Sequence, residues 1–183
     1  MQDSGPKQRA TYPRRLLADE RGVVGVEYAL LLPLMVSALM GAVETFWAVQ
    51  AYGKAVSAAQ TVADLTARSD SQSTTTMAAI ATAAQRVMDP LPSDVTAMGI
   101  HVASVAFAND GTAATQWSYV WGTGATPVPL TIAADLGRPG ESVVMVSFNY
   151  AHVPLLHDLF GGLTFRENAV ARPRITRIIP FTG

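Results

Sequence analysis

Few residues of this sequence have the type and spacing that metal or enzymatic chemistry needs. The histidines are His101, His152 and His157, and the last two stand five residues apart around Pro154. Paired metal ligands on one helix stand four residues apart. The only carboxylate beside them is Asp158. We therefore expect no metal site and interpret the histidines as solvated or partly buried residues.

Other catalytic signals are also missing from the sequence. It contains no Gly-x-Ser-x-Gly motif, no phosphate loop and no paired acids at a meaningful spacing, and 122–124 predicts a plain loop. Absence of cysteine excludes thiol catalysis, iron–sulfur chemistry and disulfides. A net charge of −1 argues against nucleic-acid binding. We predict a protein that is not an enzyme, with no catalytic residues and no cofactor. The serines outside any motif are Ser104, Ser118, Ser142 and Ser147.

Glu27 is the residue whose position most needs an explanation. It is the only charge in residues 23–43, an apolar run of 21 residues. About 20 apolar residues suffice to cross a bilayer as a helix. A carboxylate at the centre of a membrane costs roughly 2.5–3.5 kcal/mol. Two interpretations stay open: an acid tolerated at headgroup depth, or a carboxylate that pairs with a positive charge inside the membrane.

The flanks of the apolar run predict its direction. Residues 1–22 carry five basic and three acidic residues and too few apolar ones to fold alone. After the run, Lys54 and Arg68 are the only basic residues before the polar break at residue 69. The positive-inside rule then places the N-terminus in the cytoplasm. We predict a cytoplasmic leader at 1–22, a transmembrane helix at 23–48 and an exported domain at 49–183.

The remaining pattern predicts an α+β fold. We expect one helix over 24–67, kinked at Pro33, whose second half is amphipathic. A second helix should cover 75–88. An antiparallel sheet should follow, with strands at 98–108, 116–121, 141–151 and 172–180. The expected buried face of the long helix comprises Val49, Tyr52, Val56, Ala59, Ala63 and Thr66.

The start of the apolar run carries a resemblance to a known family. Arg21-Gly22-Val23-Val24-Gly25-Val26-Glu27-Tyr28, followed by Ala29-Leu30-Leu31-Leu32-Pro33, resembles the processing motif of type IV prepilins. More narrowly, it is similar to pilins and pseudopilins of the tight adherence (Tad/Flp) system. The resemblance implies that a prepilin peptidase cuts after Gly22, so that Val23 becomes the first mature residue. Glu27 and Tyr28 then take the fifth and sixth mature positions and serve recognition and assembly.

The C-terminal part is similar to TadE-like pseudopilins. The order is an alternating strand at 143–150, a proline-led apolar turn at 154–156, a glycine pair at 161–162, and a final strand ending near Arg172 and Arg174. The resemblance implies a minor pilin or pseudopilin of the bacterial inner membrane, with a periplasmic head. Its partners would be the prepilin peptidase, other pilin subunits, the inner-membrane assembly platform and membrane lipid. The length favours this over the major subunit, because major pilins of the family are very short.

An alternative class is an exported or anchored binding domain with an ordinary signal sequence. Residues 37–42 offer small residues at which a signal peptidase could cut. A periplasmic enzyme, the third class, has no supporting constellation.

Several residues, at the outer end of the span and in the C-terminal part, fit more than one role. Trp47 and Tyr52 fit an interfacial aromatic belt, and Glu44 fits the outer interface. Residues 154–163 fit an apolar lip near the membrane, a subunit contact or core packing. The basic C-terminal residues fit a solvated strand face or a contact with a partner or anionic lipid: Arg166, Arg172, Arg174 and Arg177.

Overall fold

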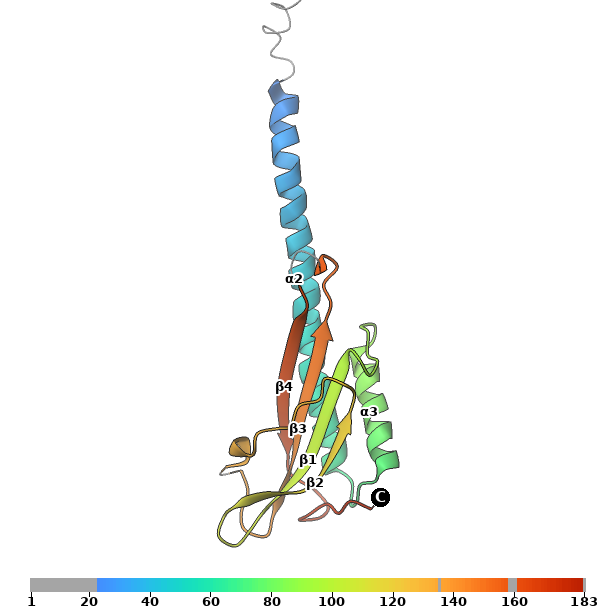
Figure 1. Cartoon of the computed structure of the whole chain (residues 1–183), viewed down its shortest axis with the longest axis vertical. Coiled ribbons are helices and arrows are strands. Elements are labelled where there is room, and N and C mark those ends of the chain that lie inside the picture. The colour runs from blue at the N-terminus through green and yellow to red at the C-terminus, as the bar shows by residue number, and fades with distance from the viewer. Residues whose placement is uncertain (1–22, 135, 158–160, 183) are drawn as a thin grey trace, which may run out of the picture. The chain divides into compact units, whose positions relative to one another are not determined.

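The structure is a computed structural model that describes residues 23–134, 136–157 and 161–182. Its contacts divide the chain into two compact units, residues 1–43 and residues 44–183, and each is considered by itself (Figure 1). The predicted leader, residues 1–22, lies outside the described residues. The two-helix and antiparallel-sheet architecture predicted from the sequence is confirmed.

The first element described is the long helix α2, Val23–Ala67. Alanine is its most frequent residue and has the highest helix propensity. The helix continues through Pro33, and the Ser37 hydroxyl donates to the Pro33 carbonyl at 2.7 Å. The predicted helix over 24–67 is therefore confirmed, whereas the predicted kink at Pro33 stays a prediction.

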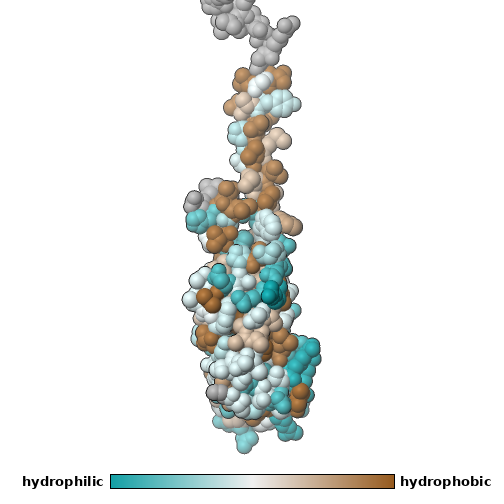
Figure 2. Space-filling view, turned by 90° about the vertical axis from the view of Figure 1, so that its right-hand side faces the viewer, coloured by the Kyte–Doolittle hydropathy of each residue, from teal (hydrophilic) through white to brown (hydrophobic). Residues whose placement is uncertain are grey.

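The part of α2 in the first unit is covered by exposed apolar side chains. Figure 2 shows this stretch mostly in the colours of hydrophobic residues. Among the described residues, α2 is the one helix long and apolar enough to cross a membrane. Its length and composition are those of a membrane anchor. The exposed apolar residues here include Val24, Val26, Leu30, Leu31, Leu32, Leu34, Met35, Val36 and Leu39.

In the second unit, a short helix α3, Thr74–Met88, follows α2. A capping box starts it: the Ser73 hydroxyl accepts from the Thr76 N–H at 3.2 Å, and the Thr76 hydroxyl accepts from the Ser73 N–H at 2.7 Å. The helix predicted at 75–88 is confirmed to within one residue. Its buried side chains are Met77, Ile80, Ala81, Ala84 and Met88.

Four antiparallel strands form one sheet in the order β2-β1-β3-β4. β1 is Met98–Phe107 and β2 is Ala113–Trp121, joined by a turn in which Gly111 has φ +82°. β3 is Ser142–His152 and β4 is Leu163–Ala171. The second strand begins three residues earlier than predicted at 116.

The last strand was predicted at 172–180, and this prediction is wrong. The strand is β4, and the segment after it is irregular. Pro173 and Pro180 have no N–H to give to a ladder, which disfavours a strand between them. Ile179 is instead fully buried in the core, and its carbonyl accepts from the Trp117 indole N–H at 2.7 Å.

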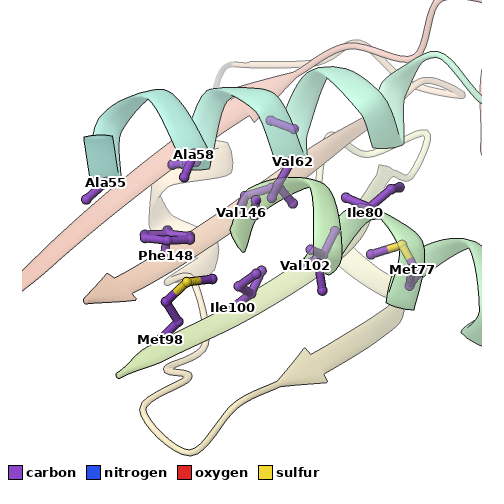
Figure 3. Packing of buried hydrophobic residues seen from close by; sticks show 14 of the residues in the cluster. Ala55, Ala58, Val62, Met77, Ile80, Met98, Ile100, Val102, Val146 and Phe148 are labelled. Atoms are coloured by element: carbon purple, nitrogen blue, oxygen red, sulfur yellow. The ribbon is translucent and has the colours of Figure 1, made fainter. Parts of the chain in front are cut away.

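The main core lies between the helices and one face of the sheet. Small residues of α2, including Ala55, Ala58 and Val62, lie over the central strands (Figure 3). Ile100 and Val102 of β1 join Val146 and Phe148 of β3 on this face, with Met77 and Ile80 of α3 beside them. Alanine allows the helix to approach the sheet closely.

The buried face of α2 differs from the predicted one. Ala59, Ala63 and Thr66 are buried as expected, but Val49 and Tyr52 are exposed. The helix is rotated so that alanines rather than the larger side chains meet the sheet. Hydrophobic periodicity weights bulky residues more strongly than alanine, which explains the error.

A second, smaller core covers the opposite face of the central strands. Val105 and Phe107 of β1 pack with Val143 and Met145 of β3. Val128 and Ala133 cover them, and Ala133 ends the short 3-10 helix Leu130–Ala133. Both faces of β1 and β3 are thus buried, which makes them rigid supports for the loops at their ends.

Candidate functional site

The first candidate site is the motif at the start of α2. Gly22 lies outside the described residues, and Val23 is the first residue of the helix. Glu27 and Tyr28 follow within the first two turns, and both side chains are exposed. Within the described part of the chain, the Glu27 carboxylate has no hydrogen-bond or ion-pair partner. The structure therefore presents this acid, exposed, on an otherwise apolar stretch of helix.

The second candidate site begins with Glu44, the first residue of the second unit. Its side chain is only 8% exposed, and its Oε1 accepts from the Leu156 N–H at 2.8 Å. This bond ties the connection between β3 and β4 to α2 across 112 positions of sequence. The other oxygen, Oε2, is buried with no hydrogen-bond partner among the described residues. The expected location of Glu44 at the outer membrane interface stays a prediction.

His152 ends β3 close to this tie. Its ring stacks on Phe165 of β4, with centroids 6.1 Å apart, and its Nε2 is buried without a partner among the described residues. Tyr52 of α2 packs edge-on against the same Phe165 at 5.8 Å. The aromatic side chains thus join α2 to β4 inside the head, while the membrane-belt role expected for Tyr52 stays a prediction.

A pocket of about 500 Å³ opens beside Glu44 and His152. Its walls are mostly apolar, and none of its lining residues is a lysine or an arginine. Asp94 is the second acid in the lining. The other lining residues are Trp47, Leu91, Pro92, Thr96, Ala97, Tyr150, Ala151, Val153 and Leu155.

Asp94, at the wall of the pocket, has structural partners. The Asp94 carboxylate accepts from the Thr96 hydroxyl at 2.5 Å and from the N–H groups of Thr96 and Ala97. The Thr96 hydroxyl bond, followed by the backbone bonds, lowers the pKa of Asp94, so it caps the turn as a carboxylate. Burial, and then the negative charge of Asp94, raise the pKa of Tyr150. The Tyr150 ring lies beside that of His152, with centroids 6.4 Å apart.

The histidines do not come together as ligands. His101 lies on β1, half-buried, and burial lowers its pKa. His152 ends β3, and His157 lies exposed in the following connection. In the part of the chain that the structure describes, no three histidine, aspartate or glutamate side chains are placed to hold a metal ion.

The basic C-terminal residues have two kinds of surroundings. Arg166 is exposed on β4. Arg172 and Arg174 follow that strand, so the strand face expected for them is wrong. Arg174 pairs with Asp64 of α2 at 2.5 Å, and Arg172 donates to the Leu136 carbonyl at 2.7 Å. These bonds fasten the C-terminal segment to the rest of the head.

A long apolar helix followed by a helix-covered antiparallel sheet defines an α+β protein whose N-terminal helix suggests membrane anchoring, without an evident catalytic centre among the described residues. Comparison with known proteins narrows this class. Residues 22–64 match the family model of the TadE-like proteins, and the matched segment is TadE-like, the class associated with Tad pilus systems. The resemblance found at the N-terminal motif is thereby confirmed, whereas the C-terminal resemblance lies outside the matched residues. This family is not an enzyme family. No curated protein and no solved structure matches the chain.

The Glu44–Leu156 tie was missed by sequence reasoning. Glu44 is recognisable in the sequence as a charge at the end of an apolar run, but nothing in the sequence indicates a partner so far along the chain. The Asp64–Arg174 pair was missed for the same reason.

Proposed function

We propose that this chain is a minor pilin or pseudopilin that supports assembly of a Tad-type adhesion pilus. It is inserted in the bacterial inner membrane with the N-terminus in the cytoplasm and the head in the periplasm. The proposal rests on the family match and the exposed acid lying at the same part of the chain. The TadE-like match begins at Gly22, and five residues further on stands Glu27, exposed and without a partner among the described residues.

In the proposed mechanism, a prepilin peptidase cuts between Gly22 and Val23. The cut leaves a new α-amino group on Val23, and Glu27 of one subunit pairs with this amine on its neighbour. In a low dielectric the attraction between the two charges is much stronger than in water. An unpaired carboxylate there is unfavourable, so the pair fixes the register of neighbouring helices.

The proposed partners are the peptidase, other pilin subunits, the inner-membrane assembly platform and membrane lipid. The apolar surface of α2 between residues 24 and 39 suits packing against lipid and then against the helices of other subunits. The head is large enough to present its own contacts to such partners.

One structural feature favours a second candidate function, an exported binding domain with an ordinary signal sequence. The second unit begins at Glu44, so a signal peptidase cut near Val43 would release a compact domain. Against this, the TadE-like match runs across the boundary from residue 22 to residue 64. The pilin proposal uses the whole matched segment, whereas the signal-sequence alternative discards half of it.

Replacing Glu27 by alanine tests the proposed mechanism. We expect Glu27→Ala to insert into the membrane normally, because the change removes the one charge of the apolar run. We expect it to be absent from pili, because the partner amine loses its carboxylate. The measurement compares carbonate-resistant membrane protein with protein in sheared pili. Met35→Ala, at another exposed position of the helix, is the matched control and should leave both amounts unchanged. Normal incorporation of Glu27→Ala into pili would contradict the pairing mechanism.

A further inference from the structure

Four exposed apolar side chains belong to the two segments that the Glu44–Leu156 hydrogen bond joins, and we call them the lip: Phe46, Val49, Val153 and Leu155. Their exposed fractions are 63%, 64%, 68% and 72%. They belong to two segments, the part of α2 just after Glu44 and the connection that follows β3 (Figure 1). Trp47 lies between the two helix residues in the sequence; its ring centroid is 6.0 Å from that of Phe46, and it lines the pocket together with Val153 and Leu155.

The connection that carries half of the lip is held in place. The Leu156 N–H binds the Glu44 carboxylate, and Pro154 is buried. At the end of β3, the Ala151 N–H donates to the Ala97 carbonyl at 2.8 Å. Val153 and Leu155 are therefore held where they line the pocket and yet stay largely exposed. Their outward position is built into the head, which suits a surface that meets something apolar.

The position of Glu44 in the chain indicates what the lip meets. Glu44 directly follows Val43, the last residue of the apolar, exposed unit. Glu44, which holds the connection after β3 through the Leu156 N–H, is therefore the first residue beyond the end of that segment. When residues 24–43 cross a bilayer, this level is the boundary between hydrocarbon and headgroups. Apolar side chains and tryptophan partition favourably there.

We propose that the lip inserts into the interface of the lipid bilayer, so that the head docks on the membrane from which its anchor emerges. Asp94 and Glu44 limit the depth, because a carboxylate that enters the hydrocarbon is unfavourable. The lip carries no basic residue, so docking does not need anionic lipid. The inference rests on the proposed function in one respect, that residues 24–43 span a membrane. It does not depend on cleavage or on pilus assembly.

The absence of cysteine allows a direct test with single-cysteine variants of the full chain. Leu155→Cys reports on the lip, Met35→Cys on the anchor, and Val120→Cys on an exposed apolar position of β2. Each variant carries an NBD fluorophore and is reconstituted into vesicles of neutral phosphatidylcholine. Quenching is measured with lipids that carry a doxyl group at a shallow or a deep position of the acyl chain.

We expect the probe at Leu155 to be quenched severalfold more than the probe at Val120, and more by shallow than by deep doxyl groups. The probe at Met35 should be quenched by deep doxyl groups. Adding Val153→Ser and Phe46→Ser should lower quenching at Leu155, whereas adding Ile175→Ser, another exposed apolar position, should not.

Two other outcomes overturn the inference in distinguishable ways. Strong quenching at Met35 together with quenching at Leu155 no greater than at Val120 would leave the anchor intact and remove the docking surface. The lip would then be a contact surface for a protein partner. Weak quenching at Met35 as well would remove the membrane span, and with it both the docking surface and the proposed function.

Discussion

At the scale of single residues, two acids on α2 have opposite surroundings. Glu27 is exposed on an apolar helix and has no partner among the described residues, whereas Glu44 is buried and accepts from a backbone N–H. A buried donor or acceptor that loses its partner is expensive, while an exposed one is not. The two acids therefore have different roles: Glu27 is placed for contacts outside the chain, whereas Glu44 stabilises the head.

Replacing Glu44 by alanine should loosen the connection after β3. The Leu156 N–H loses its acceptor, so we expect the free energy of unfolding of the head to fall by about 1–3 kcal/mol. Hydrogen exchange of the Leu156 amide in the detergent-solubilised full chain measures the local effect, and it should become faster.

Glu44→Gln is the matched control for that change. An amide oxygen can still accept from the Leu156 N–H, so the exchange rate should stay much closer to that of the unchanged protein. Equal acceleration in the alanine and glutamine variants would show that the hydrogen bond does not hold the connection.

The motif at Glu27 could be predicted from the sequence, whereas the environment of Glu44 could not. Motif recognition needs only local spacing, and Gly22, Val23, Glu27 and Tyr28 lie within seven positions. The partner of Glu44 depends on how β3 returns to α2, which local spacing does not encode.

At the scale of elements, α2 combines two surfaces in one helix. Its first part is apolar and exposed, and its second part buries a face of alanines against the sheet. The length of the helix was predictable from its apolar run and the absence of later prolines. Its buried face was mispredicted because alanine gives a weak hydropathy signal, although its small size allows close packing.

Enlarging one buried alanine should disturb this packing. Ala58 is fully buried in the main core, near Phe148 (Figure 3). We expect Ala58→Leu to lower the free energy of unfolding by about 1–3 kcal/mol, because a well-packed core accommodates added methylenes poorly. Denaturant unfolding of the full chain in detergent, followed by tryptophan fluorescence, measures it.

Gln60→Leu is the matched control, because it also introduces a leucine but on the exposed face of α2. It should change the free energy of unfolding little. A stability of Ala58→Leu equal to that of the unchanged protein would contradict the close approach of α2 to the sheet.

The strands show where sequence patterns mislead. β1 and β3 are buried on both faces and were found from their apolar content. β4 has Phe165, Glu167, Ala169 and Ala171 on its partly buried side, a mixture that resembles no strand pattern. The isoleucines after it, Ile175, Ile178 and Ile179, gave a stronger signal, but only Ile179 is buried.

At the scale of the whole molecule, an apolar helical unit precedes a compact α+β head. The head uses no disulfides, and alanine packing, two-sided burial of the central strands and ties such as Asp64–Arg174 hold it together. Such an arrangement suits a subunit that is anchored first and assembled later. Residues 69–141, between the two segments that resemble TadE-like proteins, supply α3 and the first hairpin of the sheet.

The central claim is that the chain is processed as a pilin, and the mature N-terminus tests it most directly. The protein is isolated from host membranes with and without the prepilin peptidase, and its first residue is determined by mass spectrometry. We predict a chain that begins at Val23 only when the peptidase is present. A chain that begins near Val43 would identify a released domain, and one that keeps Met1 in both strains would leave an unprocessed protein; either result would contradict the pilin proposal.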